Sequence, residues 1–374
     1  MSLLLDDAEV IGRIFDHIDG KSTDLGEDVW REPVESYSSQ ERFDAEINLL
    51  RRLPVPFCPS AALPEAGSYI ARTSAGTPLL VVRGDDGVVR AFRNACRHRG
   101  MAVADGSGCQ RSFVCPYHNW AYDLDGSLKH ITDAEGFPGL DKDQHGLVPV
   151  TAEEKGGLVF ITQEEPVSGG ALDYMPDLIA PDNIVFNSIE IVDEANWKLI
   201  GETSMEGYHI KALHNKTFFP YGFDNLNVVQ TYGPNSRIVF PFRRVEKMRD
   251  VPREERYLDG LVTDVYQFFP NTHVTKLSSH SMLIILEPVS PTRTRWVIYQ
   301  MRPKKEGESD ADVAEAKRDA GFVQDSGLKE DRDAACSIQA GLAGNANSHF
   351  TFGHFEQGIV HFHKTLHELL SKVG

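Results

Sequence analysis

Two short segments of the chain each place a cysteine close to a histidine. One residue separates Cys96 from His98 in the first segment, and two residues separate Cys115 from His118 in the second. Sixteen residues lie between the two pairs. Thiolate and imidazole groups are ligands for zinc, copper and iron–sulfur centres. The spacing therefore predicts a metal site that is built from two tight loops.

Two kinds of metal centre fit these four side chains. Zinc binds two cysteines and two histidines tetrahedrally, but its motifs usually pair cysteine with cysteine and histidine with histidine. A [2Fe–2S] cluster with two histidines on one iron and two cysteines on the other takes one cysteine and one histidine from each of two loops. Because the chain has this grouping, we expect the cluster, with zinc as the alternative. Neutral histidine ligands also raise the reduction potential, which suits an acceptor of electrons from a reductase.

The segment 196–214 carries a second group of candidate ligands. It contains no proline, so a continuous helix is possible. His209 and His214 are five residues apart, and on a regular helix their side chains would point about 140° apart. They can bind one ion only if the helix bulges, kinks or ends between them, and Gly207 makes such a distortion easier. The i,i+4 histidines of zinc proteases need no distortion, so this spacing argues against such an enzyme.

Two glutamates lie on the same segment. A continuous helix would place Glu202 and Glu206 at i,i+4, where like charges repel each other. They would then need a nearby cation or hydrogen-bond donor, and a metal-bound His209 would be such a donor. Taken alone, the segment fits equally well a solvated helix face with two ordinary histidines.

A ferrous site with two histidines lacks one carboxylate. The segment 327–342 offers Glu330, Asp331 and Asp333. On a helix, Asp331 shares an apolar stripe with Ala335, Ile338 and Leu342. A carboxylate on an apolar face is costly unless a cation meets it, so we expect Asp331 to bind iron, with Asp333 as the second candidate. Alternatively, all three acids only favour the positive N-terminus of a helix.

The chain has three stretches that differ in composition and in hydrophobic periodicity, and these would position the candidate residues. Residues 1–43 are charged, and their apolar residues have helical spacing. Residues 44–165 contain short β-rich runs between glycine-containing turns, which predicts a small antiparallel β domain. Residues 166–374 mix helix-period stretches with strand-like runs, which predicts a larger α+β domain.

Composition and charge restrict the class of protein. The chain has 374 residues, more than one hydrophobic core usually organises, and a hydrophobic fraction of 41% argues against disorder. Its 55 acidic and 38 basic residues give a net charge of −17, which argues against nucleic acid or an anionic membrane as the main partner. We find no secretory signal and no apolar run that would span a membrane, so we expect a cytoplasmic enzyme. In a reducing compartment its five cysteines are thiols or metal ligands before disulfides.

The two cysteine–histidine segments resemble a known motif. Residues 92–100 (FRNACRHRG) and 115–128 (CPYHNWAYDLDGSL) are similar to the Rieske motif of the Rieske non-haem iron oxygenases. Members of that family commonly have glycine where this chain has Asn119, a difference that bears on loop geometry rather than on ligation. The resemblance covers essentially residues 44–345.

The second group resembles the catalytic-domain motif of the same family. In that motif two histidines bind mononuclear iron, and a preceding carboxylate links to the Rieske histidine of a neighbouring subunit. The matching residues here are His209, His214 and Glu206, and Asp331 matches the third ligand in a late helix. Most members have aspartate as the linking residue. Glutamate at this position is a similarity to the branch that contains carnitine monooxygenase and related enzymes acting on methylated amines.

The resemblance implies a fold and an activity. The fold would be a Rieske domain at 44–165 and a helix-on-antiparallel-sheet catalytic domain of the SRPBCC (Bet v1-like) type at 166–374, with residues 1–43 packed on the latter. The activity would be that of a terminal oxygenase, which uses O2 and electrons from NAD(P)H, delivered by a reductase or ferredoxin. The implied cluster ligands are Cys96, His98, Cys115 and His118. The implied ligands of the Fe2+ ion are His209, His214 and Asp331.

Partners and substrate follow from the resemblance less completely. Head-to-tail transfer between subunits implies a homotrimer in which Glu206 joins His118 of the next chain to its own His209. The substrate would be a small aromatic or N- or O-methylated molecule that is hydroxylated, demethylated or dihydroxylated. Aromatic residues after His214 are candidates for its pocket or for the core: Phe218, Phe219, Tyr221, Phe223, Phe268 and Phe269. The alternatives from other classes are a Rieske electron carrier and a zinc-stabilised binding module.

Overall fold

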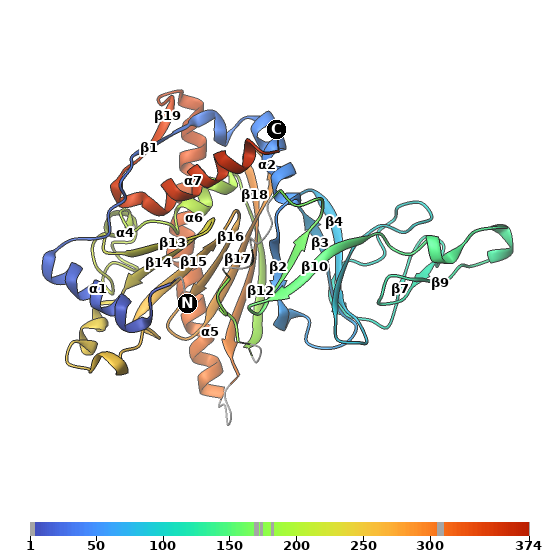
Figure 1. Cartoon of the computed structure of the whole chain (residues 1–374), viewed down its shortest axis with the longest axis horizontal. Coiled ribbons are helices and arrows are strands. Elements are labelled where there is room, and N and C mark those ends of the chain that lie inside the picture. The colour runs from blue at the N-terminus through green and yellow to red at the C-terminus, as the bar shows by residue number, and fades with distance from the viewer. Residues whose placement is uncertain (1–3, 168–171, 173–174, 181–182, 305–309, 374) are drawn as a thin grey trace. The chain divides into compact units, whose positions relative to one another are not determined.

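The computed structural model describes residues 4–167, 172, 175–180, 183–304 and 310–373, and the chain divides into two compact units (Figure 1). The small unit comprises Leu50–Asp182, and the large unit comprises Met1–Leu49 with Asn183–Gly374. The chain thus begins in the large unit, forms the small unit and returns. The following paragraphs describe each unit by itself.

The small unit is built on a seven-stranded sheet with the order β2-β11-β10-β5-β4-β3-β6, in which every pairing is antiparallel. Ala75 and Gly76 form the turn between β3 and β4, and both have positive φ angles, 45° and 75°. The strands are β2 (Val55–Pro59), β3 (Ser68–Ser74), β4 (Thr77–Arg83), β5 (Val89–Arg93), β6 (Gly106–Cys109), β10 (Pro149–Lys155) and β11 (Leu158–Thr162). The prediction of a small antiparallel β domain is confirmed.

A second sheet of the small unit contains β7 (Phe113–Val114), β8 (Ala121–Tyr122) and β9 (Leu128–His130). Its Phe113 and Tyr122 are fully buried in a core that also contains Cys96, Cys115 and Trp120. This core therefore fixes the two cysteine loops from the inside.

The large unit has its own seven-stranded antiparallel sheet with the order β12-β18-β17-β16-β15-β14-β13 (Figure 1). Its strands are β12 (Asn183–Asp193), β13 (Val228–Tyr232), β14 (Asn235–Pro241), β15 (Val262–Phe268), β16 (Thr272–Lys276), β17 (Ser281–Ser290) and β18 (Arg293–Pro303). A separate ribbon pairs β1 (Trp30–Pro33) with β19 (His349–Phe352). Strands β15, β17 and β18 are largely buried, as the prediction of a helix-on-sheet domain requires.

Helices pack against this sheet. Helix α3 packs against β17 and α6, and α7 packs against β13 and β14. The helices are α1 (Asp7–Gly20), α2 (Gln40–Arg51), α3 (Trp197–Glu202), α4 (Ile210–Leu213), α5 (Asp310–Asp325), α6 (Gly327–Gly341) and α7 (Gln357–Leu370). Within the described ranges, no helix combines the length and apolar character that crossing a membrane requires. The predicted α+β class is confirmed.

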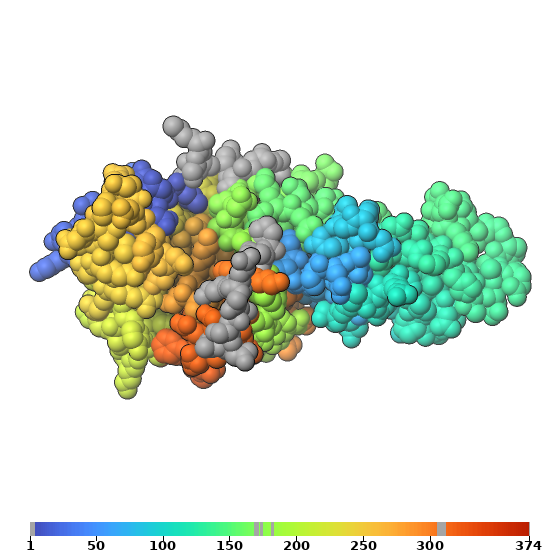
Figure 2. All heavy atoms as spheres, turned by 90° about the horizontal axis from the view of Figure 1, so that it is seen from below, coloured from blue at the N-terminus to red at the C-terminus, as the bar shows by residue number. Residues whose placement is uncertain are grey.

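Helix α1 is the amphipathic helix that the N-terminal sequence predicts. The Asp6 carboxylate accepts a hydrogen bond from the Glu9 backbone N–H at 2.8 Å, and the Glu9 carboxylate accepts one from the Asp6 N–H at 3.0 Å. Its apolar face packs on the segment of residues 243–262, and Figure 2 shows the blue helix beside this gold segment. The buried residues of the helix are Val10, Ile11, Ile14 and Phe15.

A buried ion pair joins α2 to α3. The Nζ atom of Lys198 lies 2.8 Å from both carboxylate oxygens of Glu46, and the two side chains are 0% and 1% exposed. Glu46 also accepts hydrogen bonds at 2.9 Å from the indole of Trp197 and the guanidinium of Arg42. Burial lowers the pKa of Lys198, and the Glu46 carboxylate opposes that shift. The pair anchors the helix that leads into the histidine segment.

Removal of this lysine is expected to destabilise the large unit. Lys198→Met keeps the length of the side chain but leaves the Glu46 charge buried without its main partner, which costs about 3 kcal/mol. The melting temperature of the large unit should fall by roughly 6–12 °C. Differential scanning calorimetry measures this shift. Lys364→Met, which removes a surface ion pair with Asp28, should leave the transition nearly unchanged, and equal shifts would contradict the role of burial.

Candidate metal centres and the adjoining pocket

The two cysteine loops of the small unit have the same backbone closure. Cys96 follows β5, and its N–H donates to the carbonyl of Met101 at 2.8 Å. Cys115 follows β7, and its N–H donates to the carbonyl of Trp120 at 2.8 Å. Each cysteine therefore begins a tight loop that returns five residues later, and each loop carries one of the two histidines.

Asn119 adopts a backbone conformation that favours glycine, the residue that members of the family commonly have at this position. Its φ angle is 56°, in the left-handed region, and its N–H donates to the carbonyl of Cys115 at 2.9 Å. Gly100 has the equivalent place in the first loop, with a φ angle of 81° and an N–H that donates to Cys96. Asparagine is one of the few residues other than glycine that tolerate this region. The difference from the family motif therefore leaves the loop geometry intact.

The four side chains converge as two pairs. The Nδ1 atoms of His98 and His118 lie 3.1 Å apart, and the His98 ring stacks on Trp120 with 5.0 Å between ring centroids. Cys96 and Cys115 are 4% and 1% exposed. Burial raises the pKa of the Cys115 thiol, and the adjacent Cys96 raises it further. Two neighbouring buried thiols become thiolates only if a cation stabilises them, so the pairs fit a two-iron cluster.

The spacing of these atoms argues against zinc. A tetrahedral zinc ion requires its four ligand atoms to lie within about 4 Å of one another. In the described part of the chain, the only group with three potential ligand atoms that all lie within 4.8 Å of one another is elsewhere, in the large unit. A cluster with two irons separates the histidine pair from the cysteine pair, as this geometry requires.

The histidine segment of the large unit is not one continuous helix, which corrects the expectation for 196–214. Helix α3 ends at Glu202, and the four-residue helix α4 begins only at Ile210. His209 directly precedes α4 and His214 directly follows it. The break also separates the two glutamates: Glu202 accepts a hydrogen bond from the Tyr37 hydroxyl at 2.8 Å, away from Glu206. The break after Glu202 lies before both histidines, and the single turn of α4 places the two imidazoles at its two ends, where their Nε2 atoms lie 3.2 Å apart.

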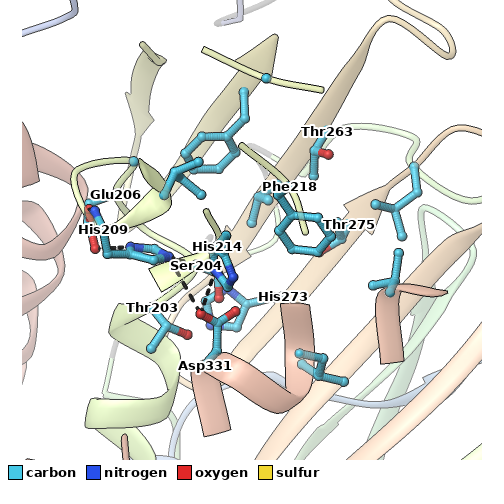
Figure 3. Close-up of a pocket in the computed structure, with 18 of the residues that line it drawn as sticks. Thr203, Ser204, Glu206, His209, His214, Phe218, Thr263, His273, Thr275 and Asp331 are labelled. Carbon is cyan, nitrogen blue, oxygen red and sulfur yellow. Dashed lines mark hydrogen bonds and ion pairs between the residues drawn. The ribbon is translucent and has the colours of Figure 1, made fainter. Parts of the chain in front are cut away.

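Three potential ligand atoms form a compact triangle (Figure 3). The Nε2 atoms of His209 and His214 lie 3.2 Å apart. One carboxylate oxygen of Asp331 lies 3.0 Å from Nε2 of His214 and 3.5 Å from Nε2 of His209. Around an octahedral ion with ligand distances near 2.1 Å, adjacent ligand atoms lie about 3.0 Å apart. The triangle therefore fits one face of such an ion and leaves the opposite side for other ligands.

Carboxylates hold both imidazoles from behind. Nδ1 of His209 contacts a Glu206 oxygen, whose carboxylate also accepts the backbone N–H of His209 at 3.2 Å. Nδ1 of His214 lies 2.7 Å from Glu330, which also accepts the hydroxyl of Thr217 at 2.7 Å. Burial lowers the pKa of each imidazole, but the neighbouring carboxylates outweigh it and the net shift is upward. These contacts aim both Nε2 atoms at the same point, as is typical of metal-bound histidines.

The three acidic candidates on α6 have different positions. Asp331 joins the triangle, Glu330 contacts the outer nitrogen of His214, and Asp333 is 66% exposed and pairs with Lys329. The predicted apolar stripe is only partly correct, because Ile338 is 44% exposed. Packing of α6 against α3, rather than a long apolar stripe, turns Asp331 inward.

An apolar cavity of about 150 Å³ adjoins the triangle. Phe218 and Phe223 line it, whereas Tyr221 is 60% exposed and Phe269 packs against Phe362. Four of the six aromatic candidates, including Phe219 and Phe268, therefore lie outside the lining. The lining also contains three aromatic residues from other parts of the chain: Phe240 on β14, Phe242 just after β14, and Trp296 on β18.

Some residues of this site have no recognisable signal in the sequence. Glu330 is expected from the sequence only as a candidate iron ligand, although its offset of one residue from Asp331 indicates a different direction on the helix. His273 lines the cavity but lies in an ordinary strand sequence without a motif. Burial lowers the pKa of His273 to about 4, so its imidazole is neutral at pH 7.

Comparison with known families agrees with both centres. Residues 54–141 match the Rieske [2Fe-2S] domain, and residues 185–372 match the catalytic domain of the ring hydroxylating alpha subunit. Since the second match covers half of the chain, the chain belongs to the family of ring-hydroxylating alpha subunits, which are Rieske non-haem iron oxygenases. The predicted family and its two cofactors, a [2Fe–2S] cluster and mononuclear iron, are confirmed at the level of the domains.

Individual relatives point to one part of this family. The carnitine monooxygenase oxygenase subunit of Escherichia coli (strain K12) is 34% identical over 201 residues, which cover 50% of this chain and 53% of the relative. The chain thus spans about half the length of that relative. Chloroplastic choline monooxygenase of Atriplex hortensis is 28% identical, with coverage of 82% and 70%. A quaternary ammonium Rieske monooxygenase solved with L-carnitine has the same fold, with a TM-score of 0.78, 22% identity and coverage of 97% and 98%.

Proposed function

We propose that this chain is the terminal oxygenase of a multicomponent monooxygenase that acts on a small N-methylated molecule. It receives electrons that originate from NAD(P)H through a reductase or ferredoxin, and it uses them with O2 to hydroxylate or demethylate the substrate. The observation that carries the proposal is the ligand triangle, which lies directly beside an apolar cavity. The names of the carnitine and choline relatives support the methylated substrate class.

The chain would bind its two metal centres with separate sets of residues. The cluster ligands are Cys96, His98, Cys115 and His118. The iron ligands are His209, His214 and Asp331. When bound, ferrous iron supplies open positions at which O2 is activated with electrons from the cluster. Glu206 and Glu330 keep the imidazoles oriented, and the apolar lining limits the access of water to the bound substrate.

Glu206 would also connect neighbouring subunits. Its carboxylate already contacts Nδ1 of His209, and a second contact to His118 of the next subunit would place that subunit's cluster beside this iron. A head-to-tail contact of this type closes into a ring, and we propose a homotrimer. Light scattering on the intact protein tests this assembly, and a fully active monomer would exclude it.

An electron carrier is the second candidate function. A carrier has a use for the cysteine–histidine loops but none for a ligand triangle beside a cavity. Metal analysis separates the two functions, since a cluster with mononuclear iron gives about three irons per chain and a cluster alone gives two. The decisive experiment is a panel of methylated amines with a surrogate reductase, in which formation of product is measured rather than consumption of NADH. Product from no member of the panel would refute the proposed substrate class.

Cys115→Ser is expected to abolish the cluster. Serine is a poor ligand for a soft iron–sulfur centre, so the red-brown absorption and two of the three irons should be lost while the mononuclear iron remains. Absorption spectra and iron analysis of anaerobically purified protein measure both changes. Cys109→Ser, which alters an exposed cysteine of the same unit, should leave them unchanged. An intact cluster in the first variant would remove Cys115 from the ligand set.

A further inference from the structure

The cavity beside the triangle contains two buried polar side chains without protein partners. His273 on β16 is 2% exposed, and neither ring nitrogen has a hydrogen-bond partner among the described residues. Trp296 on β18 is 3% exposed, and its indole N–H is also without a partner in the described ranges. Both side chains line the cavity, and His273 is labelled in Figure 3. Buried polar groups are nearly always hydrogen-bonded, so these two require an explanation.

Strand register places the two rings on the same face of the sheet. His273 pairs with Ile284 on β17, and Leu286, two residues further along β17, pairs with Trp296. Directly paired residues and residues two apart on a strand share one face. Ile284 and Leu286 also line the cavity, so the two polar rings lie diagonally across an apolar strip. They can therefore contact one small molecule at the same time.

The charges around the cavity restrict what that molecule can be. No lysine or arginine lines the cavity in the described part of the chain. The lining carboxylates of Glu206 and Asp331 already face His209 and His214. Apart from the Fe2+ ion that the triangle would hold, whose charge Asp331 partly balances, a substrate carboxylate would be buried without a permanent cation, which is unfavourable. A hydroxyl or carbonyl oxygen needs only hydrogen bonds, and a neutral imidazole and an indole provide them.

We propose that His273 and Trp296 form an oxygen-binding end of the substrate pocket. It takes a hydroxyl or carbonyl group of an uncharged or cationic substrate and rejects a substrate whose oxygens form a carboxylate. The inference rests on the proposed function for the position of the substrate, and it narrows the substrate class from methylated amines in general to amino alcohols and their carbonyl analogues. The imidazole accepts or donates one hydrogen bond and the indole donates one.

Matched ligands test this selection by calorimetric binding to the holoprotein. The probes are choline, glycine betaine and trimethylpropylammonium, which share the cationic group and differ in a hydroxyl, a carboxylate or no oxygen. Benzyl alcohol, benzoate and ethylbenzene form a second set without the cation. In the set that binds, the alcohol should bind at least tenfold more tightly than the acid and the hydrocarbon. Tighter binding of an acid, or binding of none of the six probes, would overturn the proposal.

Substitutions test whether His273 and Trp296 cause the preference for the alcohol. His273→Phe and Trp296→Phe keep aromatic volume but remove hydrogen-bonding groups, so each should weaken binding of the alcohol at least tenfold and leave the hydrocarbon unchanged. His273→Asn retains a donor and an acceptor and should restore part of the affinity. Unchanged binding of the alcohol in both phenylalanine variants would contradict the assignment.

Stability without ligand distinguishes a binding role from a structural one. An unpartnered buried imidazole destabilises the empty protein, so His273→Phe should leave the melting temperature unchanged or raise it. A structural histidine would give the opposite result, and a clear fall in melting temperature would count against the proposal. Iron content and the dithionite-reduced EPR signal of the same samples report on the proposed function separately, because they are expected to stay normal whether or not the pocket selects alcohols.

Discussion

Asp331→Ala is expected to lose the mononuclear iron and retain the cluster. The substitution removes one corner of a triangle whose sides are 3.0, 3.2 and 3.5 Å, and two histidines alone hold ferrous iron weakly. Product formation should fall about 1,000-fold or more, which corresponds to about 4 kcal/mol. Iron analysis should decrease from about three to two irons per chain, while the visible spectrum of the cluster stays the same.

The same helix provides the matched control for this experiment. Asp333 also carries a carboxylate on α6, but its side chain is 66% exposed and faces Lys329 rather than the imidazoles. Asp333→Ala should keep full iron content and activity within about twofold of the unmodified protein. If Asp333→Ala lost iron and Asp331→Ala did not, the assignment of the third ligand would be wrong.

Glu206→Ala is expected to separate metal binding from turnover. The side chain contacts His209 but is not a member of the triangle, so both metal centres should remain occupied. If the carboxylate connects the cluster of one subunit to the iron of the next, its loss should slow electron transfer about 100-fold, or about 2.7 kcal/mol in barrier. The measurement is the rate at which the pre-reduced cluster is reoxidised after O2 and substrate are added.

A nearby carboxylate controls for general effects of charge. Glu356 is partly buried, burial and the nearby Glu206 charge raise its pKa, and its carboxylate accepts the backbone N–H of Gly353 at 2.7 Å. Glu356→Gln should reoxidise the cluster at a rate within about twofold of the unmodified protein. Normal coupled turnover in Glu206→Ala would exclude a connecting role, and loss of iron from it would reassign Glu206 to support of the metal site.

Much of the fold could be predicted because the signals were local. Short apolar runs between glycine turns indicate antiparallel strands, and the spacing of Ile11, Ile14 and Phe15 indicates a buried helix face. The break after Glu202 could not be located, since no proline or left-handed glycine marks it. It depends on tertiary contacts, in which Glu202 meets Tyr37 and Lys198 meets Glu46.

The candidate site also has one part that the sequence predicts and one part that it does not. The candidate metal ligands could be proposed from the sequence because ligand chemistry restricts such residues to a few types at short spacing or in a known motif. The pocket could not, because its aromatic residues come from strands and loops that are distant in sequence and adjacent only in the folded sheet. Trp296 is an example: only strand register places its indole on the same face as His273.

The histidines flank a helix of four residues, and from this arrangement we expect iron binding to change how easily proteases cleave the chain. A single helical turn is unstable on its own. An ion that is bound by the histidines at both ends of α4 would therefore stabilise the loop from 203 to 226. Newly made chains without metal should expose this loop to proteases, and chains with metal should resist cleavage there. In cells short of iron, proteases would then degrade the metal-free chains selectively. The iron supply would determine the amount of the protein as well as its activity.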